Sequence, residues 1–121
     1  IFNAAVNKGK PFEVLWDGQV FEWEGYVIPE GAPNAEAAME YIKFATSSAS
    51  SARFSERISY GTPRKSAAPL VGNVNGTDIP MAPNLPTYPA NMTNALASSA
   101  DFWVDRETEL GERFNAWLLS N

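Results

Sequence analysis

The chain has 121 residues, 45% of them hydrophobic, which suits one globular unit with a modest core. Its formal charge of -5 and sequence pI near 4.6 disfavour nucleic acids and anionic membrane surfaces as partners. The chain has no cysteine and no histidine, which excludes thiolate and imidazole catalysis, disulfides and ordinary zinc sites. No apolar run approaches the roughly 20 residues that span a bilayer. We therefore expect no cofactor, no metal and no stable membrane insertion.

The first third of the chain is predicted to be mainly extended. Residues 1–6 read as the tail of a helix, because a glycine and a proline follow shortly after. Residues 12–28 read as a strand pair: 12–16 are strand-like, Asp17 and Gly18 form a hairpin-type dipeptide, and 19–28 return antiparallel.

Two acids stand at alternate positions of the returning strand. Because alternate side chains of a strand share a face, Glu22 and Glu24 are expected to project the same way. Trp23 then points to the opposite face, which suits the core, unless a bulge at Gly25 reverses it. From spacing alone, the acidic face is either a site for a cation or a solvated surface.

The middle of the chain, residues 34–59, is predicted to be helical. Asn34 is a good N-cap for a helix over residues 35–45, where apolar residues recur at helical spacing. A serine-rich break is expected over residues 46–51, and a second helix over 52–58.

The last third is predicted as a loop followed by helices. Residues 72–89 contain four prolines and are expected to form an extended loop, after a short helix over residues 65–71. Residues 90–121 are expected to supply the C-terminal helices, one over residues 90–98 and a last one capped by Asp105.

A resemblance to a known family rests on ordered short motifs that together cover nearly the whole chain. These motifs are Trp16-Asp17-Gly18, residues 21–31, residues 34–44, Tyr60-Gly61-Thr62-Pro63, Phe102-Trp103 and residues 112–117. In this order they resemble the C-terminal third of bacterial extracellular solute-binding proteins of the spermidine/putrescine type, which serve ABC transporters. The resemblance implies an α/β fold, as the C-terminal segment of a two-lobed type II periplasmic binding protein. The segment itself would hold a short β-hairpin or strand pair and four to five helices.

The same resemblance implies the site residues. The strand of residues 12–28 would enter the hinge region, with Glu24 pairing with a ligand ammonium and Glu22 at a place that usually holds an aromatic residue. Tyr60 matches the family's aromatic turn, and Trp103 matches its tryptophan after the loop. Trp23 is a further candidate.

The implied function is non-enzymatic recognition. The expected partners are a small solute, a polyamine or another amine, and the permease of an ABC importer, in the periplasm or lipid-anchored outside a Gram-positive cell. The chain lacks an initiator Met and a basic leader, so we expect it to be part of a longer protein.

Two other functions remain open on the residues alone. One is a helical protein-protein interaction module, whose Trp and Phe stripes meet another chain. The other is a carboxylate-based hydrolase that uses Glu22 and Glu24 as its acid pair. Neighbours on one strand rarely flank a scissile bond from both sides, which disfavours the hydrolase.

Overall fold

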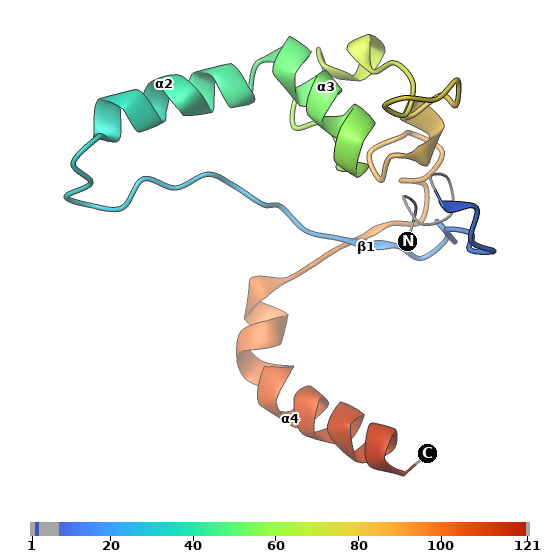
Figure 1. The fold of residues 1–121 in the computed structure, drawn as a ribbon. Coiled ribbons are helices and arrows are strands. Elements are labelled where there is room, and N and C mark those ends of the chain that lie inside the picture. The colour runs from blue at the N-terminus through green and yellow to red at the C-terminus, as the bar shows by residue number, and fades with distance from the viewer. Residues whose placement is uncertain (1, 3–7, 121) are drawn as a thin grey trace.

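The computed structural model describes residue 2 and residues 8–120, and it combines helices with a small sheet (Figure 1). In chain order the elements are β1 (Val20–Phe21), α2 (Ala35–Ala45), α3 (Ser48–Ile58), the 3-10 helices η1 (Ala68–Leu70) and η2 (Ala82–Asn84), β2 (Leu96–Ala97) and α4 (Ala100–Leu119). This content confirms the α/β class. The helix tail predicted over residues 1–6 lies, apart from residue 2, outside the described residues.

The sheet joins two distant parts of the chain. Strand β1 pairs with β2 in parallel, with Val20 opposite Leu96. The Ser98 N–H donates to the Phe21 carbonyl at 2.7 Å. The Gln19 and Phe21 carbonyls thus accept from the N–H groups of Leu96 and Ser98, and residues 12–16 form no strand. The antiparallel hairpin predicted over residues 12–28 is therefore wrong. The expected turn at residues 17–18 is present.

Side-chain amides fasten β1 to the long loop before β2. The Gln19 amide donates to the carbonyls of Pro86, at 3.0 Å, and Asn91, at 2.7 Å. The Asn91 amide, whose residue is only 8% exposed, donates to the carbonyls of Pro83 and Leu85 at 2.9 and 2.8 Å. These hydrogen bonds pair loop carbonyls that take no part in strand pairing, and they join β1 to the loop.

Helices α2 and α3 follow one another as an arm (Figure 1). The helix predicted over residues 35–45 is confirmed, although the Asn34 side chain makes no capping hydrogen bond. The predicted serine-rich break over residues 46–51 is present but shorter, since only residues 46–47 separate α2 from α3. The Ser47 hydroxyl caps α3 by accepting from the Ser50 N–H at 3.3 Å, so the helix begins at Ser48.

Three later parts of the chain also differ from the prediction. Of residues 65–71, only η1 is helical. Residues 90–98 contain turns and β2 instead of a helix, because the backbone there pairs with β1. Helix α4 begins before Asp105, since the Ser99 hydroxyl accepts from the Phe102 N–H at 3.2 Å and caps it earlier.

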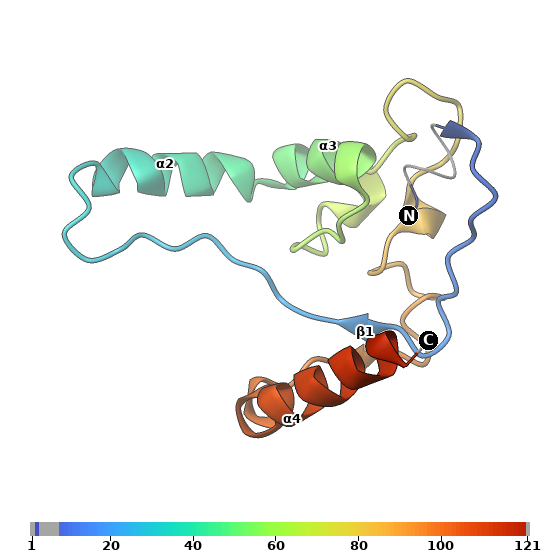
Figure 2. The same ribbon diagram turned by 60° about the horizontal axis from the view of Figure 1, so that its bottom comes forward.

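The core is small and lies in the loop region. Val74, Met81 and Leu85 form its buried cluster, with Phe2 and Val71 packed against it. Helix α4 projects away from this core in both views (Figures 1 and 2). Over residue 2 and residues 8–120, no helix is both long and apolar enough to cross a membrane.

The amide bonds of the loop give a first prediction. Asn91→Ala removes the two hydrogen bonds that the Asn91 amide donates to the Pro83 and Leu85 carbonyls, so we expect it to lower the free energy of unfolding by about 1–3 kcal/mol. Asn94→Ala is the matched control, because the Asn94 amide bonds only the exposed Asp17 carboxylate, and its effect should stay within about 0.5 kcal/mol. Urea unfolding measures both; equal losses would contradict the assigned role of Asn91.

A second prediction concerns the close approach of Gly61 to Thr87. A Cβ on Gly61 would lie 2.3 Å from the Thr87 Cγ2. We expect Gly61→Ala to destabilise the fold by about 1–3 kcal/mol through this overlap. Adding Thr87→Ala, which removes the clashing methyl, should recover most of the loss in a double-mutant cycle followed by thermal unfolding.

Gly25→Ala is the control for that cycle, because no heavy atom lies within 4 Å of the Cβ it would add. If Gly25→Ala and Gly61→Ala cost the same, or Thr87→Ala gives no recovery, the overlap is not what requires glycine at residue 61.

Candidate functional site

An extended segment carries the two predicted acids out of the sheet. Strand β1 ends at Phe21, and residues 22–29 continue without regular structure toward α2. Because the hydrogen bonds to β2 end near Ser98, the sheet fixes where this segment starts. Glu22 and Glu24 are both exposed. The backbone next to the two acids is therefore anchored through β1, while their side chains are exposed to solvent.

A cavity of about 1100 Å³ lies between this segment and the helical arm. Its walls are residues 19–26, the C-terminal half of α2, the cavity side of α3, the turn over residues 59–63, and a few residues of the long loop. A volume of this size suits a small-molecule ligand. The residues that line it are chemically mixed: aromatic, hydroxyl-bearing and charged.

Four of the five predicted site residues line this cavity: Glu22, Trp23, Glu24 and Tyr60. Trp103 does not. It lines a smaller adjoining hollow of about 290 Å³, to which Glu22 also contributes. The two hollows thus share Glu22, and the predicted residues meet at the start of the extended segment.

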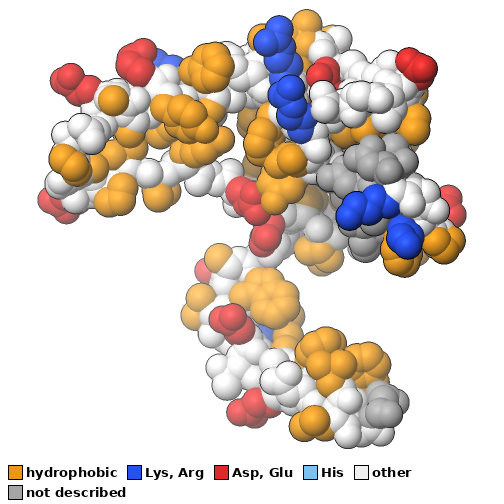
Figure 3. Space-filling model, viewed as in Figure 1, with side chains coloured by type: hydrophobic (Ala, Val, Ile, Leu, Met, Phe, Trp, Pro, Cys, Tyr) orange, Lys and Arg blue, Asp and Glu red, His pale blue; other side chains and the backbone are white. Residues whose placement is uncertain are grey.

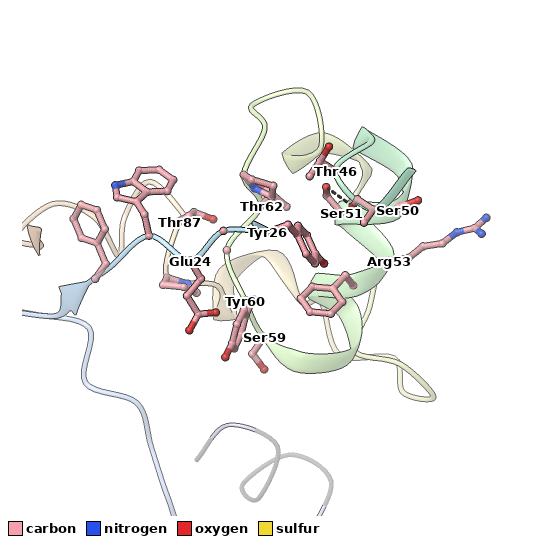
Figure 4. Close-up of a pocket in the computed structure, with 18 of the residues that line it drawn as sticks. Glu24, Tyr26, Thr46, Ser50, Ser51, Arg53, Ser59, Tyr60, Thr62 and Thr87 are labelled. Carbon is pink, nitrogen blue, oxygen red and sulfur yellow. Dashed lines mark hydrogen bonds between the residues drawn. The ribbon is translucent and has the colours of Figure 1, made fainter. Parts of the chain in front are cut away.

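Glu24 and Tyr60 come from opposite walls. In Figure 4 the Glu24 carboxylate and the Tyr60 phenol project to the same side of the cavity. The Tyr60 ring packs edge-on against Phe54 of α3, with ring centroids 6.0 Å apart. A carboxylate together with an aromatic ring and a hydroxyl can bind an ammonium group and its adjoining methylenes.

Trp23 departs from the expected core position. It is 79% exposed and packs edge-on against Phe21, with centroids 6.2 Å apart. The alternation rule fails because β1 ends at Phe21, so residues 22–24 are not held in a pleated strand. As a result Trp23 lines the same cavity as the two acids.

The turn that carries Tyr60 is held by serines. The Ser55 hydroxyl, on a fully buried residue, donates to the Tyr60 carbonyl at 2.6 Å. Ser59 adopts a left-handed conformation with φ of 59°, which is uncommon for a residue with a Cβ. Its buried hydroxyl has no hydrogen-bond partner. Such strained positions occur both at helix ends and at functional sites.

Sequence reasoning missed much of the lining. The serine-rich run, interpreted as a break, supplies hydroxyls to the cavity, and so do Thr46, Thr62 and Thr87. Arg53 and Arg57 also line it, although the Arg53 side chain extends away from Glu24 in Figure 4. A dense hydroxyl run beside an aromatic turn was the available signal.

Two tyrosines join the extended segment to α2. Tyr26 packs edge-on against Tyr41, with ring centroids 5.8 Å apart. The charge of the Tyr41 phenolate, with smaller contributions from burial and a hydrogen bond to Tyr41, raises the pKa of Tyr26. The raised pKa keeps the Tyr26 phenol neutral near pH 7, so it acts as a hydrogen-bonding group rather than as a charge.

Metal binding finds no ready site in the part of the chain that the structure describes, because no three acidic, histidine or cysteine side chains gather there. The residues that line the cavity include two acids, two arginines, tyrosines, serines and threonines. These groups can bind polar organic solutes directly.

Comparisons with known proteins identify a related family. A sequence model of the family described as bacterial extracellular solute-binding protein matches residues 1–87. A gamma-aminobutyric acid-binding protein of Pseudomonas aeruginosa is 36% identical over 114 residues, which cover 94% of this chain and 31% of that protein. The chain thus spans about a third of the length of this relative. No solved structure matches it significantly. Because the family model covers well over half of its residues, the chain belongs to the bacterial extracellular solute-binding proteins.

Proposed function

We propose that this chain forms part of the substrate-binding component of an ABC importer, which captures a small solute with a primary ammonium group and delivers it to a membrane permease. The observation that carries the proposal is that Glu22, Glu24 and Tyr60 line one cavity of about 1100 Å³. Family membership supports it. The protein would act in the periplasm, or outside the cell with a lipid anchor.

The chemistry of the lining points to an amine. Two carboxylates on one wall attract a cation, and a charge-assisted hydrogen bond contributes about 1.5–3 kcal/mol. Trp23 and Tyr60 offer ring faces to a methylene chain. A polyamine and an amino acid such as γ-aminobutyrate share this ammonium-bearing chain, and the similarity to a gamma-aminobutyric acid-binding protein favours the second.

The arginines separate these two solutes. Arg53 and Arg57 stand on α3 and both contribute to the cavity lining, although the Arg53 side chain extends away from Glu24 in Figure 4. A guanidinium group pairs with a carboxylate and repels a second ammonium. We therefore propose an amino acid with separated charges in preference to a diamine.

The proposed activity is binding without turnover. Glu22 and Glu24 lie two residues apart on one segment, so they approach a solute from the same side. Hydrolysis of a glycosidic bond needs two carboxyl groups that flank it. This arrangement supports recognition rather than a hydrolase.

Binding by the complete solute-binding protein tests the proposal. Glu24→Gln keeps the shape but removes the charge, so we expect its affinity for γ-aminobutyrate to fall about tenfold or more by isothermal titration calorimetry. Glu30→Gln is the matched control, since Glu30 is an exposed acid outside the cavity lining. An affinity unchanged in Glu24→Gln, or lowered equally in Glu30→Gln, would contradict the role of Glu24.

A further inference from the structure

The acid-bearing segment has few attachments after it leaves the sheet. Residues 22–29 have no regular structure, and no backbone hydrogen bond joins residues 22–28 to another part of the chain that the structure describes. The Trp23 ring packs against Phe21 of β1, so this contact lies where the segment begins. Because unrestrained backbone keeps its conformational entropy, a segment held at this end alone would spread its acids over many positions.

A second attachment lies beyond Glu24, where two tyrosines meet. The Tyr26 ring packs edge-on against Tyr41 of α2, with ring centroids 5.8 Å apart and ring planes at 89°. The chain reverses between the two rings, at a turn in which the Ala32 N–H donates to the Pro29 carbonyl at 3.2 Å. From this turn the segment and α2 run back along each other in both ribbon views (Figures 1 and 2). The tyrosine pair therefore connects the two arms of a reversal.

Helix α2 itself is lightly packed. None of its residues is buried, and the buried cluster of the core lies in the long loop instead. Figure 3 shows hydrophobic side chains gathered between α2 and the segment, on the sides that face each other. Since the core does not fix α2, contacts between these two arms set how far apart they lie. The ring contact of Tyr26 with Tyr41 is such a contact.

We propose that Tyr26 and Tyr41 are positioning residues for solute binding: their ring contact holds the segment against α2 and thereby fixes the Glu24 carboxylate at the cavity wall. Glu24 follows the end of β1 by three residues and precedes Tyr26 by two, so the two attachments bracket it. An extended chain advances about 3.3 Å per residue, which puts Glu24 within about 7 Å of Tyr26. This inference deepens the proposed function and rests on it.

Direct contact with solute is the alternative to positioning, because both tyrosines line the cavity. The two roles differ in how substitutions combine. If the rings act through each other, either alanine substitution breaks the same contact, and the double variant loses no more affinity than a single variant. If each ring touches the solute independently, the two losses add.

Calorimetric titration of the complete solute-binding protein with γ-aminobutyrate tests the positioning role. An edge-on ring contact corresponds to about a two- to tenfold change in an equilibrium constant, so we expect Tyr41→Ala to lower the affinity by this factor. Tyr26→Ala added to it should cost nothing more, and Tyr41→Phe, which keeps the ring, should retain most of the affinity. Met39→Ala is the matched control: Met39 is 47% exposed on the same helix but does not line the cavity, so its affinity should be unchanged.

The dependence on Glu24 is tested in the same way. If the rings act by placing this carboxylate, Tyr41→Ala should lower the affinity less in the Glu24→Gln background than in the wild type. Equal losses in the two backgrounds overturn the positioning of Glu24. Additive losses from Tyr26→Ala and Tyr41→Ala, or a loss in Met39→Ala as large as in Tyr41→Ala, overturn the role of the pair.

A measurement without solute separates this inference from the proposed function. Backbone ¹⁵N relaxation of the solute-free protein reports the order of residues 23–25, and we expect their order parameters to fall in Tyr41→Ala but not in Tyr41→Phe or Met39→Ala. Unchanged order in Tyr41→Ala overturns the positioning role, whatever the affinity. A fall in order together with no binding of γ-aminobutyrate by the wild type counts against the proposed function, while it supports the tyrosine pair as the contact that orders the segment.

Discussion

The position of the site depends on one pair of side-chain amides. Gln19 and Asn91 lie 72 positions apart in the sequence, and the Gln19 amide donates to the Asn91 carbonyl while the Asn91 amide holds two loop carbonyls. Strand β1 is only two residues long, so its backbone pairing alone anchors little. The amides therefore fix the strand to the loop. Because Glu22 and Glu24 directly continue the strand, the amides also determine where the two acids lie.

Local signals made the helices predictable, and nonlocal pairing did not. Apolar spacing located α2, and the apolar residues of the last 12 positions located the body of α4. The parallel partner of β1 had no local signature, because residues 96–97 are too few to show alternation. The hairpin prediction failed for this reason: a turn dipeptide predicts a reversal of the chain but cannot say which strand lies beside it.

The site was partly predictable for a similar reason. Spacing and motif order predicted Glu22, Glu24 and Tyr60 as site residues, and all three line one cavity. The hydroxyls of α3 were missed because serines at a helix start also read as a break. Trp23 was placed in the core because a longer strand was assumed. Short elements weaken each pattern rule, and this chain has several.

The parallel pairing of β1 with β2 also has a consequence for how the chain acquires its shape. The segment bearing the acids cannot take its final position until β2 has formed, because the Gln19 and Phe21 carbonyls accept from the N–H groups of Leu96 and Ser98. Closing so long a loop lowers the conformational entropy of the chain before the contacts between β1 and β2 can stabilise it, which slows folding. During synthesis from the N-terminus, the segment that carries Glu22 and Glu24 therefore becomes ordered only after residues 96–97 have been made.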